Sequence, residues 1–149
     1  MSIEISSPLL DQLHRHVEAA YPGEGAGFLL GRDTGAQRQV IALLPLPNAR
    51  EESARYNRFL LTPQDFLKGE LEADRLDLSL LGVFHSHPDC PNRPSEYDRE
   101  WAMPWFSYII TRVDGSNGAG QAVSDLSWRL EENRLSYTEE KVVVLSEEN

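Results

Sequence analysis

The spacing of apolar residues along the chain predicts two longer helices, each opened by a capping signal. The first begins at Ser6-Ser7-Pro8, an N-cap followed by proline, and Pro22-Gly23 ends it. Its apolar residues recur at helical spacing and are Leu9, Leu10, Leu13, Val17, Ala20 and Tyr21. The second helix begins at Thr62-Pro63, where Asp65 supplies the acid of a capping box.

Runs of apolar, β-branched and aromatic residues between turn-forming residues predict the strands. The predicted strands are residues 27–31, 37–46, 55–61, 78–84, 105–113, 121–130 and 134–145. A short helix is expected between Asp98 and Pro104, and a mobile, glycine-rich turn over 114–120. Elements in this order favour a mixed α/β domain, with a single curved β-sheet flanked by helices.

Composition narrows the class of protein. The chain has 149 residues, 40% of them hydrophobic, and no repeat or linker divides it, so residues 1–149 are predicted to form one domain. A net charge of −10 argues against binding nucleic acid, which needs clustered Lys and Arg. No apolar run approaches the roughly 20 residues of a membrane span. No basic leader with an apolar segment opens the chain, so a cytoplasmic protein is expected.

The candidate chemistry follows the strand 78–84. His85 and His87 are two residues apart, a spacing that places both imidazoles on one face of a strand. A proline-rich loop leads to Ser95 and then to Asp98. Two His and one Asp are ligands of the kind that a catalytic zinc uses, with a fourth position left for water. Two simpler interpretations stay open, since Ser95 and Asp98 also form a capping box and the two His could merely end a strand.

Two neighbouring residues have alternative interpretations. Glu24 lies among Gly23, Gly25 and Gly27, where it is either a solvated residue of a flexible turn or a base beside the metal. Cys90, the one cysteine, lies in the predicted metal loop and is interpreted as incidental; it excludes an intrachain disulfide. Ser86 points to the opposite strand face from the two His and is interpreted as structural.

The motif formed by His85-Ser86-His87-Pro88, Ser95 and Asp98 resembles the JAMM (MPN+) metalloprotease signature. Residues 21–31, which contain Glu24, resemble the first strand of that family, and the resemblance extends to Trp128. Further similar positions are Asn48, Tyr56 and Phe59, whereas Ala26 stands where many bacterial relatives have Cys. The resemblance implies the MPN/JAMM fold, a sheet flanked by helices in a cytidine-deaminase-like layout.

The resemblance also implies a mechanism. His85, His87 and Asp98 would hold Zn²⁺, Glu24 would act as general base and then acid, and Ser95 would stabilise the oxyanion. The implied substrate is a ubiquitin-like sulfur-carrier protein, cleaved after its C-terminal Gly-Gly. An inactive MPN-type interaction module and a zinc hydrolase of a small amide remain as alternatives. Residues 50–58 could form a loop over the site. Neither His-Glu-x-x-His nor Gly-x-Ser-x-Gly occurs, which argues against a helix-borne zinc protease and a serine hydrolase.

Overall fold

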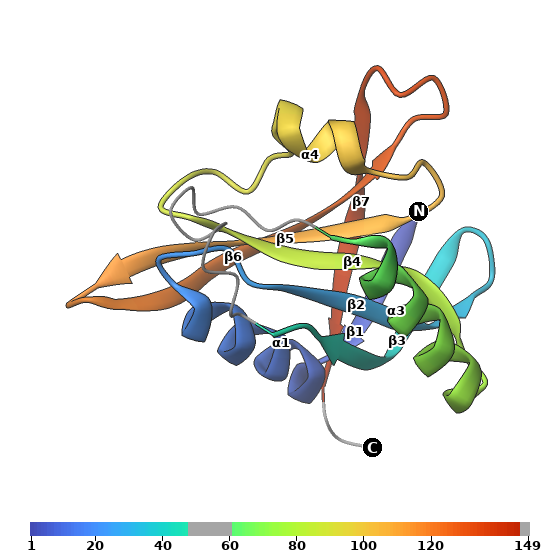
Figure 1. The fold of residues 1–149 in the computed structure, drawn as a ribbon, viewed down its shortest axis with the longest axis horizontal. Coiled ribbons are helices and arrows are strands. Elements are labelled where there is room, and N and C mark those ends of the chain that lie inside the picture. Colours follow the sequence, from blue (N-terminus) through green and yellow to red (C-terminus); the bar gives the residue numbers. More distant parts are fainter. Residues whose placement is uncertain (48–60, 147–149) are drawn as a thin grey trace.

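The computed structural model describes residues 1–47 and 61–146 (Figure 1). The strands are β1 Ser2–Ser6, β2 Ala26–Asp33, β3 Gln37–Pro45, β4 Ser79–Pro88, β5 Ser107–Ser116, β6 Ala119–Leu130 and β7 Tyr137–Leu145. The helices are α1 Ser7–Ala20, α3 Pro63–Leu76 and α4 Glu96–Trp101. The predicted strand 55–61, the loop 50–58 and the positions Asn48, Tyr56 and Phe59 lie outside the described residues, apart from residue 61 itself. None of the described helices is long and apolar enough to cross a membrane.

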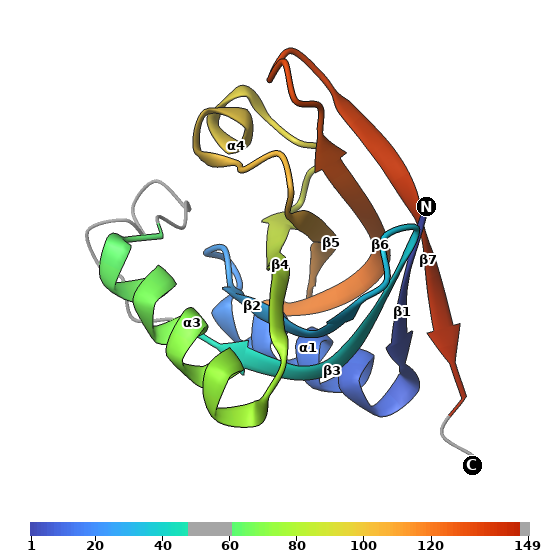
Figure 2. The same ribbon diagram turned by 90° about the vertical axis from the view of Figure 1, so that its right-hand side faces the viewer.

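The sheet is mixed, as expected, but it also closes on itself. Its strand order is β1-β3-β2-β4-β5-β6-β7, and β1 pairs with both β3 and β7 to complete a barrel. The β4–β5 pair and both pairs of β1 are parallel, while the other neighbours are antiparallel. In Figures 1 and 2, α1 lies below the strands and α4 above them. The mixed sheet with helices is therefore as predicted, whereas the predicted single curved sheet is a closed barrel in the structure.

Closure depends on β1, a strand that the sequence analysis missed. The residues before the first helix were too few to show a convincing period, because Ser6 already serves as the helix N-cap. Ile3 and Ile5 nevertheless alternate with polar neighbours and are fully buried. Ile3 pairs with Arg38 of β3 on one side and with Val142 of β7 on the other, so β1 joins the two ends of the sheet.

Two apolar clusters cover the two faces of β4. Val83 belongs to the cluster that includes Ala73 of α3, and Phe84 belongs to the cluster that includes Leu13 and Val17 of α1. Successive residues of a strand point to opposite faces, so the side chains of His85 and His87 lie on the same face of β4 as Val83. The Ser86 side chain lies on the face of Phe84, which α1 covers.

Several element boundaries differ from the sequence prediction, among them those of β4, β5, β6 and β7. β4 continues to Pro88 because β5 pairs with it along its whole second half, so the two His lie within the strand. β5 and β6 continue to a tight turn at Asn117-Gly118, both with positive φ, and most of the predicted mobile turn is therefore strand. β7 begins at Tyr137 rather than at residue 134.

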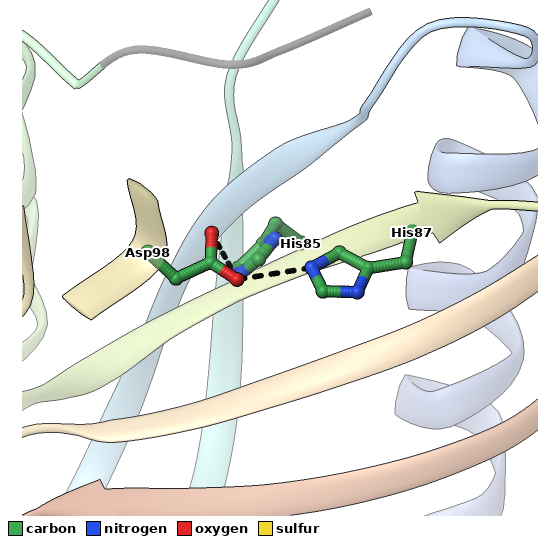
Figure 3. Close-up of side chains that lie close together, drawn as sticks. All are labelled: His85, His87 and Asp98. Carbon is green, nitrogen blue, oxygen red and sulfur yellow. Dashed lines mark hydrogen bonds and ion pairs between the residues drawn. The ribbon is translucent and has the colours of Figure 1, made fainter. Parts of the chain in front are cut away.

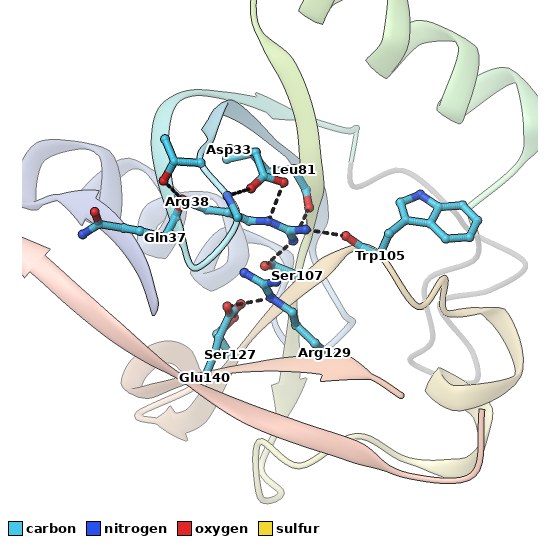
Figure 4. A network of polar contacts seen from close by, with 11 residues as sticks. Asp33, Gln37, Arg38, Leu81, Trp105, Ser107, Ser127, Arg129 and Glu140 are labelled. Atoms are coloured by element: carbon cyan, nitrogen blue, oxygen red, sulfur yellow. Dashed lines mark hydrogen bonds and ion pairs between the residues drawn. The ribbon is translucent and has the colours of Figure 1, made fainter. Parts of the chain in front are cut away.

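A buried ionic network crosses the inside of the sheet (Figure 4). Arg38 of β3 donates to the Asp33 carboxylate, the Ser107 hydroxyl and the carbonyls of Leu81 and Trp105. Burial lowers the pKa of Arg38, and the nearby charge of Arg129 lowers it further. Glu140 of β7 accepts hydrogen bonds from Arg129 and Ser127. This network could not be predicted from local sequence patterns, because each charged residue lies in a separate strand.

Candidate metal centre

The side chains of His85, His87 and Asp98 converge on one point between β4 and α4 (Figure 3). Their candidate ligand atoms all lie within 4.8 Å of one another. Asp98 Oδ2 is 3.0 Å from His87 Nε2, and Asp98 Oδ1 is 3.9 Å from His85 Nε2. Both imidazoles are nearly buried, and the carboxylate is 14% exposed. The three residues therefore form a compact donor group at one end of the sheet.

Asp98 reaches this point from the first turn of α4. Ser95 is the N-cap of the helix, and its hydroxyl accepts a hydrogen bond of 3.0 Å from the Asp98 N–H. In return, Asp98 Oδ2 accepts a bond of 2.9 Å from the Ser95 N–H. From the sequence, a capping box and a metal ligand are alternative interpretations of Asp98. In the structure its side chain does both: it closes the capping box and it lies beside the two imidazoles.

His87 is held in a defined orientation by the loop that follows it. Its Nδ1 lies 2.8 Å from the Pro91 carbonyl, which can only accept, so Nδ1 carries the proton and Nε2 is turned toward Asp98. The loop is fixed in turn by Asn92, whose side chain donates to the Ile110 carbonyl and whose own carbonyl accepts from Trp128 Nε1. A metal-binding imidazole usually has such a partner on its second nitrogen.

The electrostatics place His85 and Asp98 in the protonation states that a metal requires, whereas His87 has to give up its Nε2 proton when a metal binds. Burial lowers the pKa of His85, and the charge of Asp98 offsets this only in part. Burial also lowers the pKa of His87, but its hydrogen bonds with Asp98 and Pro91 and the charges of Asp98 and Glu24 raise it overall. For Asp98, burial acts to raise the pKa, yet the charge of His85 and the hydrogen bonds from His87 and Ser95 hold it well below its usual range. Asp98 is therefore a carboxylate at neutral pH.

The donor group fits a small divalent metal ion. For bonds of 2.0–2.1 Å in a tetrahedral site, ligand atoms are separated by about 3.3 Å. The separations of 3.0 and 3.9 Å, measured to the two different oxygens of Asp98, lie on either side of this value, and a bound ion would draw the donors together by side-chain rotation. Imidazole nitrogen and carboxylate oxygen form a donor set that suits Zn²⁺ without sulfur. Among the described residues, the acids and imidazoles that approach one another closely enough to bind a metal are these three.

The predicted catalytic residues border this centre. Glu24 lies between α1 and β2, and its charge acts on His87. Its neighbour Gly25 is joined to Ser86, the residue between the two His, by hydrogen bonds of 2.9 and 3.1 Å. Ser95 is exposed, and its hydroxyl keeps its own hydrogen for donation because the bond with Asp98 uses it as an acceptor. Cys90 is exposed in the loop and outside the donor group.

Several residues that support the centre were not predicted from the sequence. Asp89 takes a left-handed conformation after β4 and accepts hydrogen bonds from Tyr21 and Gly115. The Pro-Asp pair at 88–89 was an available turn signal, whereas nothing in the sequence marks Asn92 as a buried anchor. The two His of α1 lie outside the donor group: His14 pairs with Asp125, and His16 contacts the Ala26 carbonyl.

A closed mixed sheet that presents two imidazoles from one strand and a carboxylate from the next helix defines a class of small α/β domains with a single-metal site. Within this class, the family model described as prokaryotic homologs of the JAB domain matches residues 6–131. The chain belongs to this family, which agrees with the resemblance found in the sequence.

Similar proteins support this assignment. A relative from Thermus thermophilus, named as a probable TtuB-protein conjugate cleaving protease, is 35% identical over 107 residues, which span 72% of this chain and 68% of that protein. A relative from Pyrococcus furiosus, named desampylase, is 30% identical over 122 residues, which span 81% and 76%. The solved structure of a JAB1/MPN domain protein from Archaeoglobus fulgidus shares the fold, with a TM-score of 0.54 at 21% identity over 96% of this chain and 99% of that one.

Proposed function

We propose that this protein is a zinc-dependent isopeptidase that hydrolyses the amide bond after the C-terminal Gly-Gly of a ubiquitin-like sulfur-carrier protein. The observation that carries the proposal is the convergence of His85, His87 and Asp98 in a member of the JAB family. The names of the two relatives, a conjugate-cleaving protease and a desampylase, support cleavage of protein conjugates. The carrier substrate itself comes from the JAMM resemblance.

In this proposal His85, His87 and Asp98 hold the metal. When bound, Zn²⁺ would lower the pKa of a water molecule and polarise the scissile carbonyl. His87 directs its Nε2 toward the centre because Nδ1 donates to the Pro91 carbonyl. Burial favours the neutral state of His85, in which one ring nitrogen carries a lone pair for the metal. The Asp98 carboxylate compensates part of the positive charge.

Glu24 and Ser95 perform the remaining steps. Glu24 takes the proton from the attacking water and passes it to the leaving amine, so one carboxylate acts first as base and then as acid. Ser95 Oγ donates a hydrogen bond to the oxyanion that forms on the scissile carbonyl. The hydroxyl can do so while it accepts from the Asp98 N–H, since a serine oxygen both donates and accepts.

The proposal also covers the domain organisation and the fold. We propose a single domain over residues 1–149, because the described strands form one closed sheet. We also propose that the sheet and its helices have a cytidine-deaminase-like layout. An inactive interaction module would have no reason to keep two oriented imidazoles and an ionised carboxylate. The cytoplasmic location remains a prediction from the sequence.

The proposal is tested by measuring zinc per chain together with cleavage. Two substrates separate the enzymatic alternatives: a carrier protein joined through Gly-Gly to a lysine of a second protein, and a small amide. We expect about one zinc per chain and cleavage of the protein conjugate only. His87→Ala should lose both zinc and cleavage, and Glu24→Gln should keep zinc and lose turnover.

His14→Ala is the matched control for His87→Ala, because it removes a histidine that is paired with Asp125 outside the metal centre. It should keep zinc and cleavage. A protein that purifies without zinc and binds none would contradict the enzyme proposal. Cleavage of the small amide alone would replace the carrier substrate with the small-amide alternative.

A further inference from the structure

We propose that Ser86, the residue between the two candidate ligands, is a positioning residue that holds Glu24 over the metal centre, with Tyr21 as a second anchor on the other side of Glu24. This inference rests on the proposed function, in which Glu24 transfers protons. It gives a positioning role to Ser86, for which the sequence alone indicates only a structural role.

The first anchor is a reciprocal pair of hydrogen bonds between Ser86 and Gly25. The Gly25 N–H donates to Ser86 Oγ at 2.9 Å, and the Ser86 N–H donates to the Gly25 carbonyl at 3.1 Å. Ser86 is fully buried, and Gly25 is buried as well. Because the bond to the hydroxyl is shielded from water, the residue that follows Glu24 is fixed to the strand that carries both imidazoles.

The second anchor lies on the other side of Glu24. The Tyr21 hydroxyl donates to Asp89 Oδ2 at 2.5 Å, and Asp89 Oδ1 accepts from the Gly115 N–H at 2.8 Å. The Asp89 N–H also donates to the Val113 carbonyl at 2.8 Å. Asp89 follows His87 by two residues, so this anchor joins the start of the Glu24 segment to the metal loop and to β5.

Packing leaves the segment little freedom between the two anchors. A Cβ placed on Gly25 would lie 3.0 Å from Val17 Cα and 3.1 Å from Ala20 Cβ, both in α1. The backbone at Gly25 therefore packs closely between α1 and β4, and a side chain there would require α1 to move by a few tenths of an ångström. Glu24 is held from both directions by bonds to residues that flank the candidate ligands.

This arrangement has a chemical purpose. A general base works only when its carboxylate is within hydrogen-bond reach of the proton that it removes. Since Ser86 lies between His85 and His87, the distance from Glu24 to the metal centre is set by one strand rather than by a flexible loop. Loss of the hydroxyl would let the Glu24 segment shift while the ligands stay in place, and a displacement of about 1 Å can cost on the order of a hundredfold in rate.

The decisive measurement on the metal-free protein is amide hydrogen exchange. In Ser86→Ala the Gly25 N–H loses its acceptor, and its exchange should accelerate on the order of tenfold. Ser107→Ala is the matched control, because Ser107 is also fully buried on a neighbouring strand and its hydroxyl accepts one hydrogen bond, from Arg38. This control should leave the exchange of Gly25 at the wild-type rate. Unchanged exchange of Gly25 in Ser86→Ala would overturn the proposal.

Turnover of the zinc-loaded protein supplies the second readout. Ser86→Ala should lower kcat on the order of ten- to a hundredfold while KM and zinc per chain stay at wild-type values. Ser86→Thr keeps a hydroxyl and should recover part of the loss. Tyr21→Phe, which removes only an exposed hydroxyl, should lower kcat by a smaller factor without unfolding the protein.

The outcomes separate the two proposals. If wild-type protein cleaves no conjugate, the proposed function fails, and the exchange of Gly25 still decides whether Ser86 anchors the segment. If wild-type protein cleaves but Ser86→Ala lowers zinc content in parallel with kcat, Ser86 acts on the ligands and its assignment to Glu24 is wrong. Full activity of Ser86→Ala would also overturn it.

Discussion

Arg134 donates a hydrogen bond of 2.7 Å to the Ala102 carbonyl and thereby fastens the turn between β6 and β7 to the end of α4. The same guanidinium contacts the carbonyls of Arg99 and Glu100, and the Arg99 side chain donates back to the Arg134 carbonyl at 2.8 Å. The last carbonyls of a helix have no partners within the helix itself. Arg134 supplies those partners for the helix that carries Asp98.

Arg134→Ala should therefore weaken zinc binding without touching a ligand. The loss of its hydrogen bonds frees the C-terminal end of α4 and increases the motion of Asp98, and we expect zinc affinity to fall on the order of tenfold. Competition with a coloured chelator measures the effect. Arg75→Ala, which removes an exposed arginine paired with Glu72 on α3, is the matched control. Equal zinc affinity in Arg134→Ala and wild type would argue against this role.

Zinc should stabilise the folded protein. A ligand that binds only the folded state at a hundred times its Kd adds about 2.7 kcal/mol to the free energy of unfolding. The Tm of wild type should rise when zinc is added and fall back with a chelator. His87→Ala lacks one of the three candidate ligands, and its Tm should not respond to zinc. A zinc-dependent shift of equal size in His87→Ala would place the binding elsewhere.

His14 should make stability depend on pH. Its pKa is raised above 6.5, chiefly because its ring hydrogen-bonds to Asp125; burial opposes this, and the charges of Asp125, Glu18 and Asp11 add to it. The protonated ring is favoured in the folded state, so its stabilisation is complete below pH 6.5 and is lost as pH rises through the folded pKa.

Urea unfolding of wild type and His14→Gln across this range checks the sign. The difference in free energy of unfolding should be largest at acidic pH and should shrink above pH 6.5. The two proteins should converge in alkaline solution except for the neutral hydrogen bond to Asp125. A difference that grows with pH would mean that His14 is neutral in the folded protein.

Glu140→Gln should destabilise the barrel strongly. The Glu140 side chain is fully buried and accepts hydrogen bonds from Arg129 and Ser127, so its neutralisation leaves the Arg129 charge without its buried counter-charge. Removal of one partner of a buried ion pair costs about 3–5 kcal/mol. Glu139→Gln, one residue earlier and exposed, should change the free energy of unfolding very little. Denaturant unfolding of both variants measures the contrast.

The local structure around the metal centre could be predicted from the sequence, because each feature there depends on residues that are close together in the chain. A capping box, a proline-rich loop and two His at strand spacing each depend on neighbouring residues, and the structure contains the capping box and the paired His. Closure of the sheet was not predictable in the same way. It depends on β1 pairing with β7, strands from opposite ends of the chain, and the electrostatic interaction of Arg38 with Glu140 likewise joins residues that are distant in the sequence.

The anchors of Glu24 were missed for a related reason. A serine between two histidines has no local signature of its task, since its partner Gly25 lies in another element. The same is true of Tyr21, whose partner Asp89 follows β4. The local sequence pattern identifies the candidate ligands and catalytic residues. The residues that position them, such as Ser86 and Tyr21, are recognised only when the three-dimensional structure shows their partners.

The shared use of the Asp98 carboxylate links local folding to metal capture. The six residues of α4 are far too few for a helix that is stable by itself, and its first turn depends on the reciprocal bonds between Ser95 and Asp98. An ion bound by Asp98 would hold this turn closed, and a closed turn would present Asp98 to the ion. The degree of order in this helical turn would then depend on whether the metal is bound. Asp98→Asn would separate the two effects, because an asparagine keeps an oxygen for the cap and removes the charge.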